Sequence, residues 1–203
     1  MGAMDGSPAR WKPLPRRFYR RDPREVGPEL LNKLLVRDDG RAGRIVEVEA
    51  YCGAEDPAAH TYRGKTARNA TMFGEPGHMY VYFTYGIHWC ANAVCGELDE
   101  GVGVLIRALE PVAGIDAMRA LRPKARTDRD LANGPGKLAQ ALGITGALDG
   151  ADLVTGDQGV QIVTDGTLPP VDAVTSPRIG ISQAREHPWR WHVRDHAHVS
   201  RKA

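Results

Sequence analysis

The segment RIVEVEAYCGAEDPAAH, residues 44–60, contains the pattern that most constrains the fold of this chain. Apolar and polar residues alternate in its first half, which predicts a β-strand at about 44–51, because successive side chains of a strand point to opposite faces. The two faces would carry Val46, Val48 and Ala50 on one side and Glu47, Glu49 and Tyr51 on the other. We interpret Glu47 as a surface carboxylate. Glu49, beside an aromatic ring, is the residue best suited to activate a water molecule.

A second aromatic segment, MYVYFTYG at residues 79–86, could form the opposite wall of the same pocket. If it is a strand, Tyr80 and Tyr82 share one face and Tyr85 lies on the other. Gly86 would then allow a tight turn directly after Tyr85. Core packing is the ordinary role of aromatic residues in strands. An aromatic side chain at a hairpin tip is, however, also well placed to insert into a stack of nucleic-acid bases.

The remaining pattern predicts a mixed α+β domain, with Asp22 and Pro23 starting the first helix. Helices are expected at about 23–36, 111–121 and 133–144, and strands at about 44–51, 79–85, 88–95, 102–109, 160–163 and 190–194. Residues 122–130 are expected to form a flexible loop. The chain has 203 residues and 42% hydrophobic content, which is enough for one domain with a real core. We place this domain at 18–200, after a flexible basic arm at 1–17 whose first residues, MGAMDGSP, resemble an expression scar.

Composition also bounds the location of the protein and its binding partners. We find no apolar run long enough to cross a bilayer and no secretion signal. Three cysteines in such a chain suggest a reducing compartment, so we expect a cytoplasmic, nucleoid-associated or nuclear protein. Basic residues cluster in three places: Arg10, Lys12, Arg16, Arg17, Arg20, Arg21 and Arg24; Arg63, Lys65 and Arg68; Arg178, Arg185, Arg190, Arg194, Arg201 and Lys202. They suit a face that binds a polyanion, although charge alone favours an ordinary solvated surface.

Motifs for several other chemistries are missing. Cys90 and Cys95 lack the partners of a four-ligand metal site, so we predict no metal. The chain contains no phosphate-binding GxxxxGK[ST] sequence, no dinucleotide fingerprint and no GxSxG elbow. The segment GPGK at 134–137 could hold a phosphate at a helix start or could be a simple turn and cap.

Five ordered segments resemble the alkyladenine (3-methyladenine, N-methylpurine) DNA glycosylase family: RIVEVEAYCGAEDPAAH, TARNATMF, GHMYVYFTYGIHWCANAV, VLIRALEP and LANGPGKLAQALGI. The resemblance extends from about Phe18 to about Arg194. It implies a single compact α+β domain, with a curved, mostly antiparallel sheet surrounded by helices, and a monofunctional glycosylase without any cofactor. Double-stranded DNA containing damaged purines would be the partner of a monomeric enzyme.

The resemblance also implies a role for individual residues. Glu49 would activate the hydrolytic water, and Arg107 would assist it there and at the phosphate of the flipped nucleotide. The base-binding residues would be Tyr51, His60 and Tyr82, which sandwich the base, and Asn92, which discriminates against normal guanine. Tyr85 would fill the gap in the base stack. The loop HTYRGKT, residues 60–66, is shorter than in vertebrate-like members and differs from them in sequence. Ile87 and His88 replace residues that, in some members, flank the side chain that fills the stack. Phosphate contacts are expected from Arg63, Lys65, Arg68 and Lys137, and His88 could either contact a phosphate or simply pack within the fold.

Together, these features predict an enzyme that flips alkylated or deaminated purines out of duplex DNA and hydrolyses the N-glycosidic bond, leaving an abasic site. The substrate class comprises 3-methyladenine, 7-methylguanine and hypoxanthine. Two alternatives remain open at this stage. One is a DNA- or RNA-binding module that recognises flipped bases without hydrolysis, and the other is a hydrolase acting on free nucleosides.

Overall fold

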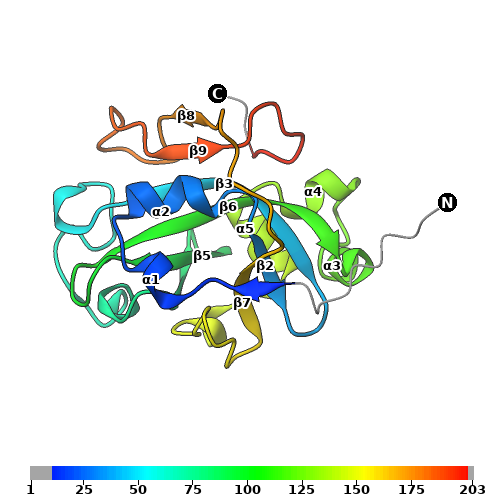
Figure 1. The fold of residues 1–203 in the computed structure, drawn as a ribbon, viewed down its shortest axis with the longest axis horizontal. Coiled ribbons are helices and arrows are strands. Elements are labelled where there is room, and N and C mark those ends of the chain that lie inside the picture. The colour runs from blue at the N-terminus through cyan, green and yellow to red at the C-terminus, as the bar shows by residue number, and fades with distance from the viewer. Residues whose placement is uncertain (1–10, 201–203) are drawn as a thin grey trace.

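One curved antiparallel sheet organises the structure, a computed structural model that describes residues 11–200 (Figure 1). Within these residues nine strands are joined in the order β1-β7-β2-β3-β6-β5-β4, and β9 pairs with both β3 and β8. Their bounds are β1 Lys12–Pro13, β2 Leu34–Arg37, β3 Ala42–Tyr51, β4 Met79–Thr84, β5 His88–Cys95, β6 Val102–Ala113, β7 Val160–Thr164, β8 Val174–Ser176 and β9 Arg190–His192. Every pairing between these strands is antiparallel.

Strand β3 lies at the centre of the sheet and has partners along both edges. It pairs with β6 from Ala42 to Tyr51, while its other edge pairs first with β2 and then, from Glu47 to Glu49, with β9. The register of β3 against β6 shifts between Ile45 and Val48. Such a bulge bends a strand and changes the direction of its side chains. Its position here is directly before the residues expected to be functional.

The helices pack on the sheet (Figure 1). Apolar side chains of both are buried in one core. Their bounds are α1 Arg16–Tyr19, α2 Pro23–Leu30, α3 Ile115–Leu121, α4 Asp128–Ala132 and α5 Pro135–Ala141, with 3₁₀ turns η2 Gly53–Glu55, η3 Ala70–Phe73 and η4 Gly146–Leu148. Helix α2 packs on β3, and α5 packs on β5 and β6. The expected single α+β domain with a curved, mostly antiparallel sheet is therefore confirmed.

Several predicted boundaries were wrong. The helix predicted at 23–36 begins at Pro23 with the Asp22 cap but ends at Leu30, and β2 follows. Asn32, with φ 67°, turns the chain out of the helix, and buried leucines on both sides gave the helix-like apolar pattern. Strand β6 continues to Ala113, through the position where a helix was expected to start, because its pairing with β3 extends that far.

The other two differences concern short helices. Residues 122–130 were predicted to be a loop, but α4 starts within them at Asp128. A capping box joins Thr127 and Asp130 at this helix start, and hydrophobic spacing alone does not reveal such a local hydrogen-bond pair. Helix α5 is shorter than the predicted 133–144. The strands predicted at 160–163 and 190–194 correspond to β7 and β9.

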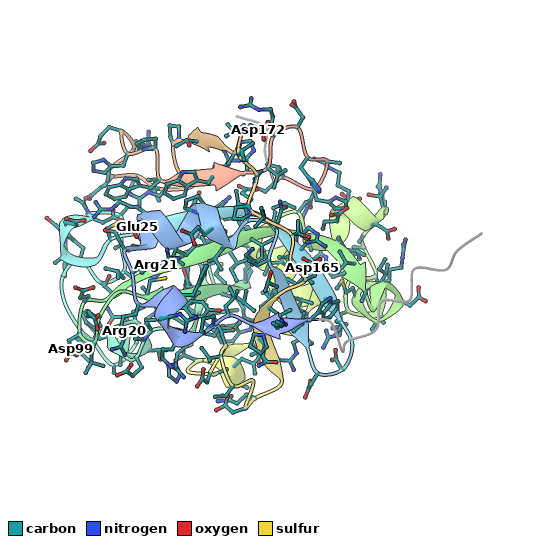
Figure 2. The ribbon with its side chains drawn as sticks, viewed as in Figure 1. Arg20, Arg21, Glu25, Asp99, Asp165 and Asp172 are labelled. Atoms are coloured by element: carbon teal, nitrogen blue, oxygen red, sulfur yellow. The ribbon has the colours of Figure 1, made fainter. Side chains whose placement is uncertain are left out.

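The N-terminal basic stretch is largely engaged within the fold. Residues 1–10 of the expected arm lie outside the described residues, whereas Lys12–Pro13 pairs with β7 and α1 begins at Arg16. Four arginines of this stretch pair with carboxylates: Arg16 with Asp152, Arg20 with Glu75, Arg21 with Glu29, and Arg24 with Asp22 (Figure 2 labels Arg20 and Arg21). None of the helices within residues 11–200 combines the length and apolarity required to cross a bilayer.

The contact between β3 and β6 gives a first prediction, on stability. A Cβ atom at Gly43 would lie 2.8 Å from the Cβ of Leu109, so Gly43→Ala should lower the free energy of unfolding by about 1–3 kcal/mol through overpacking. Urea unfolding measures the change. Gly134→Ala is the matched control, because its nearest neighbours would be Lys137 side-chain atoms at 3.8 Å or more. Equal stability of the two variants would contradict the prediction.

Candidate active site

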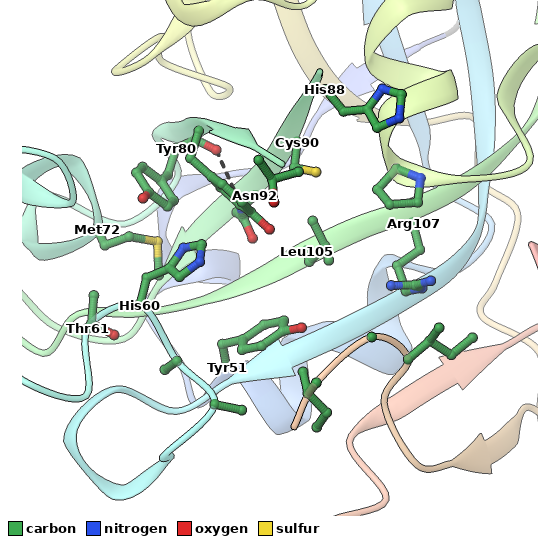
Figure 3. A pocket seen from close by; sticks show the side chains of 18 of the residues that line it. Tyr51, His60, Thr61, Met72, Tyr80, His88, Cys90, Asn92, Leu105 and Arg107 are labelled. Carbon is green, nitrogen blue, oxygen red and sulfur yellow. Dashed lines mark hydrogen bonds between the residues drawn. The ribbon is translucent and has the colours of Figure 1, made fainter. Parts of the chain in front are cut away.

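A cavity of about 420 Å³ opens at one end of the sheet (Figure 3). Side chains from β3, β4, β5 and β6 form its walls, together with the 57–61 segment, the start of α5 and the 179–183 segment. These elements come from widely separated parts of the chain. The cavity contains aromatic rings, a histidine, an asparagine and an arginine, so it combines stacking surfaces with hydrogen-bonding groups.

Glu49 lies directly behind this cavity and has no exposed surface. Its carboxylate accepts hydrogen bonds from the Tyr51 hydroxyl at 3.0 Å and the Ile179 backbone N–H at 2.7 Å, and it pairs with Arg107 Nη1 at 3.1 Å. All three partners line the cavity, whereas Glu49 itself does not. An ionised carboxylate has about four acceptor positions, so three donors leave room for one more.

Burial and charge act in opposite directions on this cluster. Burial raises the pKa of Glu49, and the lowering effects of Arg107, the Ile179 N–H and Tyr51 only partly offset it. Burial would lower the pKa of Arg107, but the two nearby carboxylates, Glu49 and Glu47, hold it above its usual value. The guanidinium therefore stays charged, while Glu49 is a stronger base than an exposed glutamate.

Aromatic rings form the wall opposite Tyr51. Tyr80 and Tyr82 stack with ring centroids 5.5 Å apart, as expected for residues on one face of β4, and the His60 ring meets Tyr82 edge-on at 4.4 Å. Burial, and then the charge of Arg68, lower the pKa of His60. The imidazole is therefore neutral at neutral pH. Such a wall is suited to a flat ligand, and its histidine would not repel a cationic one.

Asn92 is buried within the same cavity, between the aromatic wall and β6. Its side-chain amide donates a hydrogen bond to the Tyr80 backbone carbonyl at 3.2 Å, drawn as a dashed line in Figure 3. This bond fixes the orientation of the amide. The remaining amide groups are then available to a ligand in a defined direction.

The hairpin between β4 and β5 presents Tyr85 at its tip. The Tyr85 side chain is 81% exposed, and Ile87 beside it is 67% exposed. Tyr85 and Gly86 have φ values of 51° and 68°, the positive values of a tight hairpin turn. A tyrosine in this conformation is uncommon, and the turn directs the ring away from the core at the rim of the cavity.

Of the predicted phosphate-binding residues, His88 alone is among the residues that line the cavity. Arg63 and Lys65 are exposed in the loop that follows His60, and Lys65 lies 3.4 Å from Asp99. Arg68 donates to the Phe83 carbonyl at 2.8 Å. His88 lines the cavity and packs so closely on Gly136 that a Cβ there would lie 2.7 Å from the imidazole ring. The Lys137 ammonium binds the Asn133 side chain at 2.7 Å.

Comparison with known proteins identifies the family. The model for the methylpurine-DNA glycosylase family matches residues 17–197. A protein from Burkholderia lata, named "Putative 3-methyladenine DNA glycosylase", is 61% identical over 198 residues, which cover 96% of both chains. Relatives of the same name from Koribacter versatilis (49% identity over 199 residues, 96% of both chains) and Carboxydothermus hydrogenoformans (48% over 192 residues, 93% of this chain and 99% of the relative) are also similar. The chain belongs to the methylpurine-DNA glycosylase family.

Family membership confirms the resemblance found in the sequence and the enzyme class, a DNA N-glycosylase of base excision repair. The assignment of individual residues remains a prediction. In the structure of this glycosylase, Tyr51, His60, Tyr82, Asn92 and Arg107 do meet at one cavity, and Glu49 contacts it from behind.

One expectation about the glycosylase site was wrong. Glu47, predicted to be a surface carboxylate, is fully buried and binds Arg107 and Arg190, each at 2.8 Å. The Arg190 side chain and Ser200 of the C-terminal segment bury Glu47. The sequence around Glu47 does not indicate that residues about 140 or more positions later in the chain will bury it.

The prediction that Val46 and Val48 share one face of β3 was also wrong. The bulge between Ile45 and Val48 interrupts the alternation. Val48 packs in the main core, whereas Val46 packs with Ala108 and Val199.

Sequence reasoning also missed the residues that support the His60 segment. The side chains of Asp56 and Arg178 form a fully buried pair with two hydrogen bonds, at 2.6 and 2.8 Å, and Asp56 accepts the backbone N–H groups of Cys52 and Ala58. Arg178 lies 4.7 Å from the centre of the Tyr51 ring. Asp56 belongs to a recognised motif, but no local pattern connects it to Arg178.

Outside the cavity, the described residues contain one group of possible metal ligands: Glu110, His196 and His198, whose ligand atoms lie within 4.8 Å of one another. His196 Nε2 lies 3.5 Å from Glu110, and its Nδ1 is positioned to accept the His198 backbone N–H at 3.3 Å. A metal-bound histidine usually donates its second ring nitrogen, so this arrangement fits an internal hydrogen-bond pair better. The absence of a metal remains a prediction.

The Asp56–Arg178 pair gives a second prediction. Arg178→Leu should lower the free energy of unfolding by about 3–5 kcal/mol at pH 7, because it leaves a buried, uncompensated carboxylate. Arg178 helps to hold the pKa of Asp56 below 3.8 against the effect of burial. Without Arg178, burial raises the pKa of Asp56, and protonation of the carboxylate then removes the unpaired buried charge. The stability difference between wild type and variant should therefore narrow as the pH falls from 7 towards 4.

Urea unfolding across this pH range measures both effects. Arg194→Leu, which removes an exposed pair with Asp172, is the matched control and should cost less than about 1 kcal/mol. A gap between wild type and Arg178→Leu that stays constant with pH would contradict the assignment of the cost to Asp56.

Proposed function

We propose that this glycosylase flips 3-methyladenine and related alkylated or deaminated purines, including 7-methylguanine and hypoxanthine, out of double-stranded DNA and hydrolyses their N-glycosidic bond. The product would be an abasic site. The observation that carries the proposal is the contact of a buried carboxylate, Glu49, with Tyr51 and Arg107 at the wall of an aromatic cavity. The names of the similar proteins support 3-methyladenine as a substrate.

Access to the bond requires extrusion of the nucleotide from the duplex, which costs on the order of a few kcal/mol. Tyr85 would offset part of this cost by occupying the vacated place in the base stack, because its exposed ring stands at the rim of the cavity. Each aromatic–base stack contributes roughly 1–3 kcal/mol. The same hairpin thus opens the stack next to the cavity that receives the base.

The base would be held between Tyr51 on one side and His60 with Tyr82 on the other. Alkylation at N3 or N7 places positive charge on the purine, and cations are attracted to the faces of aromatic rings. His60 adds no opposing charge, because burial lowers its pKa and keeps it neutral. This cavity therefore favours purines whose damage makes them both cationic and good leaving groups.

Exclusion of normal bases would depend on Asn92. Its amide is fixed by the bond to the Tyr80 carbonyl, so it cannot rotate away without losing that bond. Placed near position 2 of the purine, it would collide with the 2-amino group of normal guanine. Selectivity then comes from rejection of the undamaged base as well as from attraction to the damaged one.

Hydrolysis would use Glu49 as the base. As the N-glycosidic bond breaks, electrons leave with the purine and positive charge grows on the sugar, which the carboxylate stabilises. The acceptor position left free by Tyr51, Ile179 and Arg107 would hold a water molecule, whose proton passes to Glu49 as its oxygen bonds to the sugar carbon. Arg107 would orient this water and contact the phosphate of the flipped nucleotide.

The DNA backbone would be bound by basic side chains around the cavity. Arg63 and Lys65 are exposed in the loop after His60, and Arg68 lies beside the β4–β5 hairpin that carries the proposed wedge. His88, at the start of β5, packs on Gly136 of α5, and Lys137 is the next residue of that helix. Contacts of this kind position the duplex without selecting a sequence.

Replacement of Glu49 tests the proposed chemistry. Glu49→Gln keeps the shape of the side chain but removes the base, so release of free purine from lesion DNA should fall by about 100-fold or more while lesion binding stays intact. Single-turnover base release and a binding titration measure the two quantities. The matched control is Glu110→Gln on β6, outside the cavity lining, which should release base at the wild-type rate.

Three outcomes separate the candidate functions. Normal base release by Glu49→Gln would refute its role as the base. Lesion binding by the wild-type protein without any release would favour a recognition module. Release from free nucleosides at the same rate as from DNA, with no dependence on salt, would favour a nucleoside hydrolase.

Tyr85→Ala tests the wedge. Binding to a lesion duplex should weaken about tenfold or more, in line with the roughly 1–3 kcal/mol of one aromatic–base stack, whereas binding to a single-stranded lesion should change little. The control is Leu168→Ala, which removes another highly exposed apolar side chain, 77% exposed, away from the cavity. Equal losses on duplex and single-stranded substrates would count against a wedge.

A further inference from the structure

Glu47 is a fully buried carboxylate to which the reaction described above assigns no role. It accepts hydrogen bonds from Arg107 Nε at 2.8 Å, from Arg190 Nε at 2.8 Å, and from the backbone N–H and hydroxyl of Ser200 at 2.7 and 2.9 Å. It does not line the cavity. A buried charge with this many donors is held in one orientation, and it holds its partners in turn.

Arg107 is the partner that reaches the cavity. Its Nε donates to Glu47, and its Nη1 lies 3.1 Å from Glu49, so two carboxylates of one strand grip one guanidinium. The guanidinium is planar and rigid. Once Nε and Nη1 are both fixed, the direction of the remaining N–H groups is fixed as well. Without Glu47, the long arginine side chain would be tied to the site by Glu49 alone.

The support for Glu47 comes from the C-terminal part of the chain. Strand β9 pairs with β3 with His192 opposite Glu47, and Arg190 of the same strand also binds the Ser176 hydroxyl at 2.7 Å. Ser200 then covers the carboxylate from a third direction. Figure 1 shows β8 and β9 together at the top of the view, and β9 joins them to the sheet by its pairing with β3.

We propose that Glu47 is a positioning residue for base excision, which holds the Arg107 guanidinium in place against Glu49, and that the segment from Arg190 to Ser200 completes this support. The inference rests on the proposed function of Glu49 and Arg107. On this proposal, the residues that support base excision include Ser200 of the C-terminal segment, which contacts Glu47 behind the cavity wall.

The charge of Glu47 has a second effect, on Glu49. Burial raises the pKa of Glu49, Arg107 lowers it, and the negative charge of Glu47 raises it further. The groups near the Glu49 carboxylate are Arg107 of β6, Glu47 and Tyr51 of β3, Tyr82 of β4, Cys90 of β5, and Arg178. If Glu47 becomes neutral while the other groups stay, the pKa of Glu49 falls. Activity that needs ionised Glu49 would then persist to lower pH.

The test compares Glu47→Gln and Glu47→Asp in single-turnover base release with enzyme in excess over 3-methyladenine DNA. With lesion DNA saturated by enzyme, Glu47→Gln should release base about 10- to 100-fold more slowly, as small displacements of a catalytic group do. The acid limb of its pH profile should move to lower pH. Glu47→Asp keeps the charge but shortens the reach, so release should slow while the acid limb stays in place.

Leu35→Ala serves as the control for lost stability, because this buried leucine of β2 lies outside the site. Its release rate should equal that of wild type under conditions where both proteins are folded. A folded Glu47→Gln enzyme with wild-type release and an unmoved acid limb would overturn the proposal. If Glu47→Gln does not fold, Ser200→Ala carries the test, since it removes the hydroxyl donor to Glu47. Release that is several-fold slower supports the inference, and wild-type release refutes it.

Glu49→Gln, measured in parallel, separates this inference from the function on which it rests. Full release by Glu49→Gln would refute the proposed chemistry itself. An inactive Glu49→Gln together with a fully active Glu47→Gln would leave the proposed chemistry intact and refute only the positioning role.

Discussion

Two carboxylates and one guanidinium, buried where β3 lies against β6, are the constraint on which the rest of the site depends. Charges removed from water cost several kcal/mol each unless every one is paired and hydrogen-bonded. Here Glu47 and Glu49 share Arg107, and Arg190 supplies a second positive charge. The bulge in β3 lies beside this cluster. The cost of burial is thus offset by an arrangement that leaves one arginine and one basic carboxylate at the cavity wall.

The cavity is lined both by residues held in the sheet and by an exposed hairpin tip. The β-strands hold Tyr51, Tyr82 and Asn92 in fixed positions, and the buried Asp56–Arg178 pair anchors the segment that carries His60. The hairpin tip stands clear of the core, with Tyr85 in solvent. The proposed wedge must leave water to enter a base stack, whereas the proposed reaction centre must keep its geometry. On this proposal, the two tasks therefore lie on adjoining but differently packed elements.

The sequence predicted best those elements whose pattern is contained in a few neighbouring residues. Alternation placed β3, β4 and β5 closely, because the period of a strand is visible in a few residues. The continuous apolar run around Leu30 and Leu35 gave no such guidance, and a helix followed by a strand was interpreted as one helix. The length of β6 was underestimated, because its last residues are strand only through pairing with β3.

The sequence by itself determined the family, the α+β class and the residues that meet at the cavity, because ordered motifs and side-chain parity are written in neighbouring residues. Only the tertiary structure decided that Glu47 is buried and that Arg178, Arg190 and Ser200 support the site. Burial depends on which distant segment covers a face, and a carboxylate in a strand has the same local pattern whether water or two arginines lie above it.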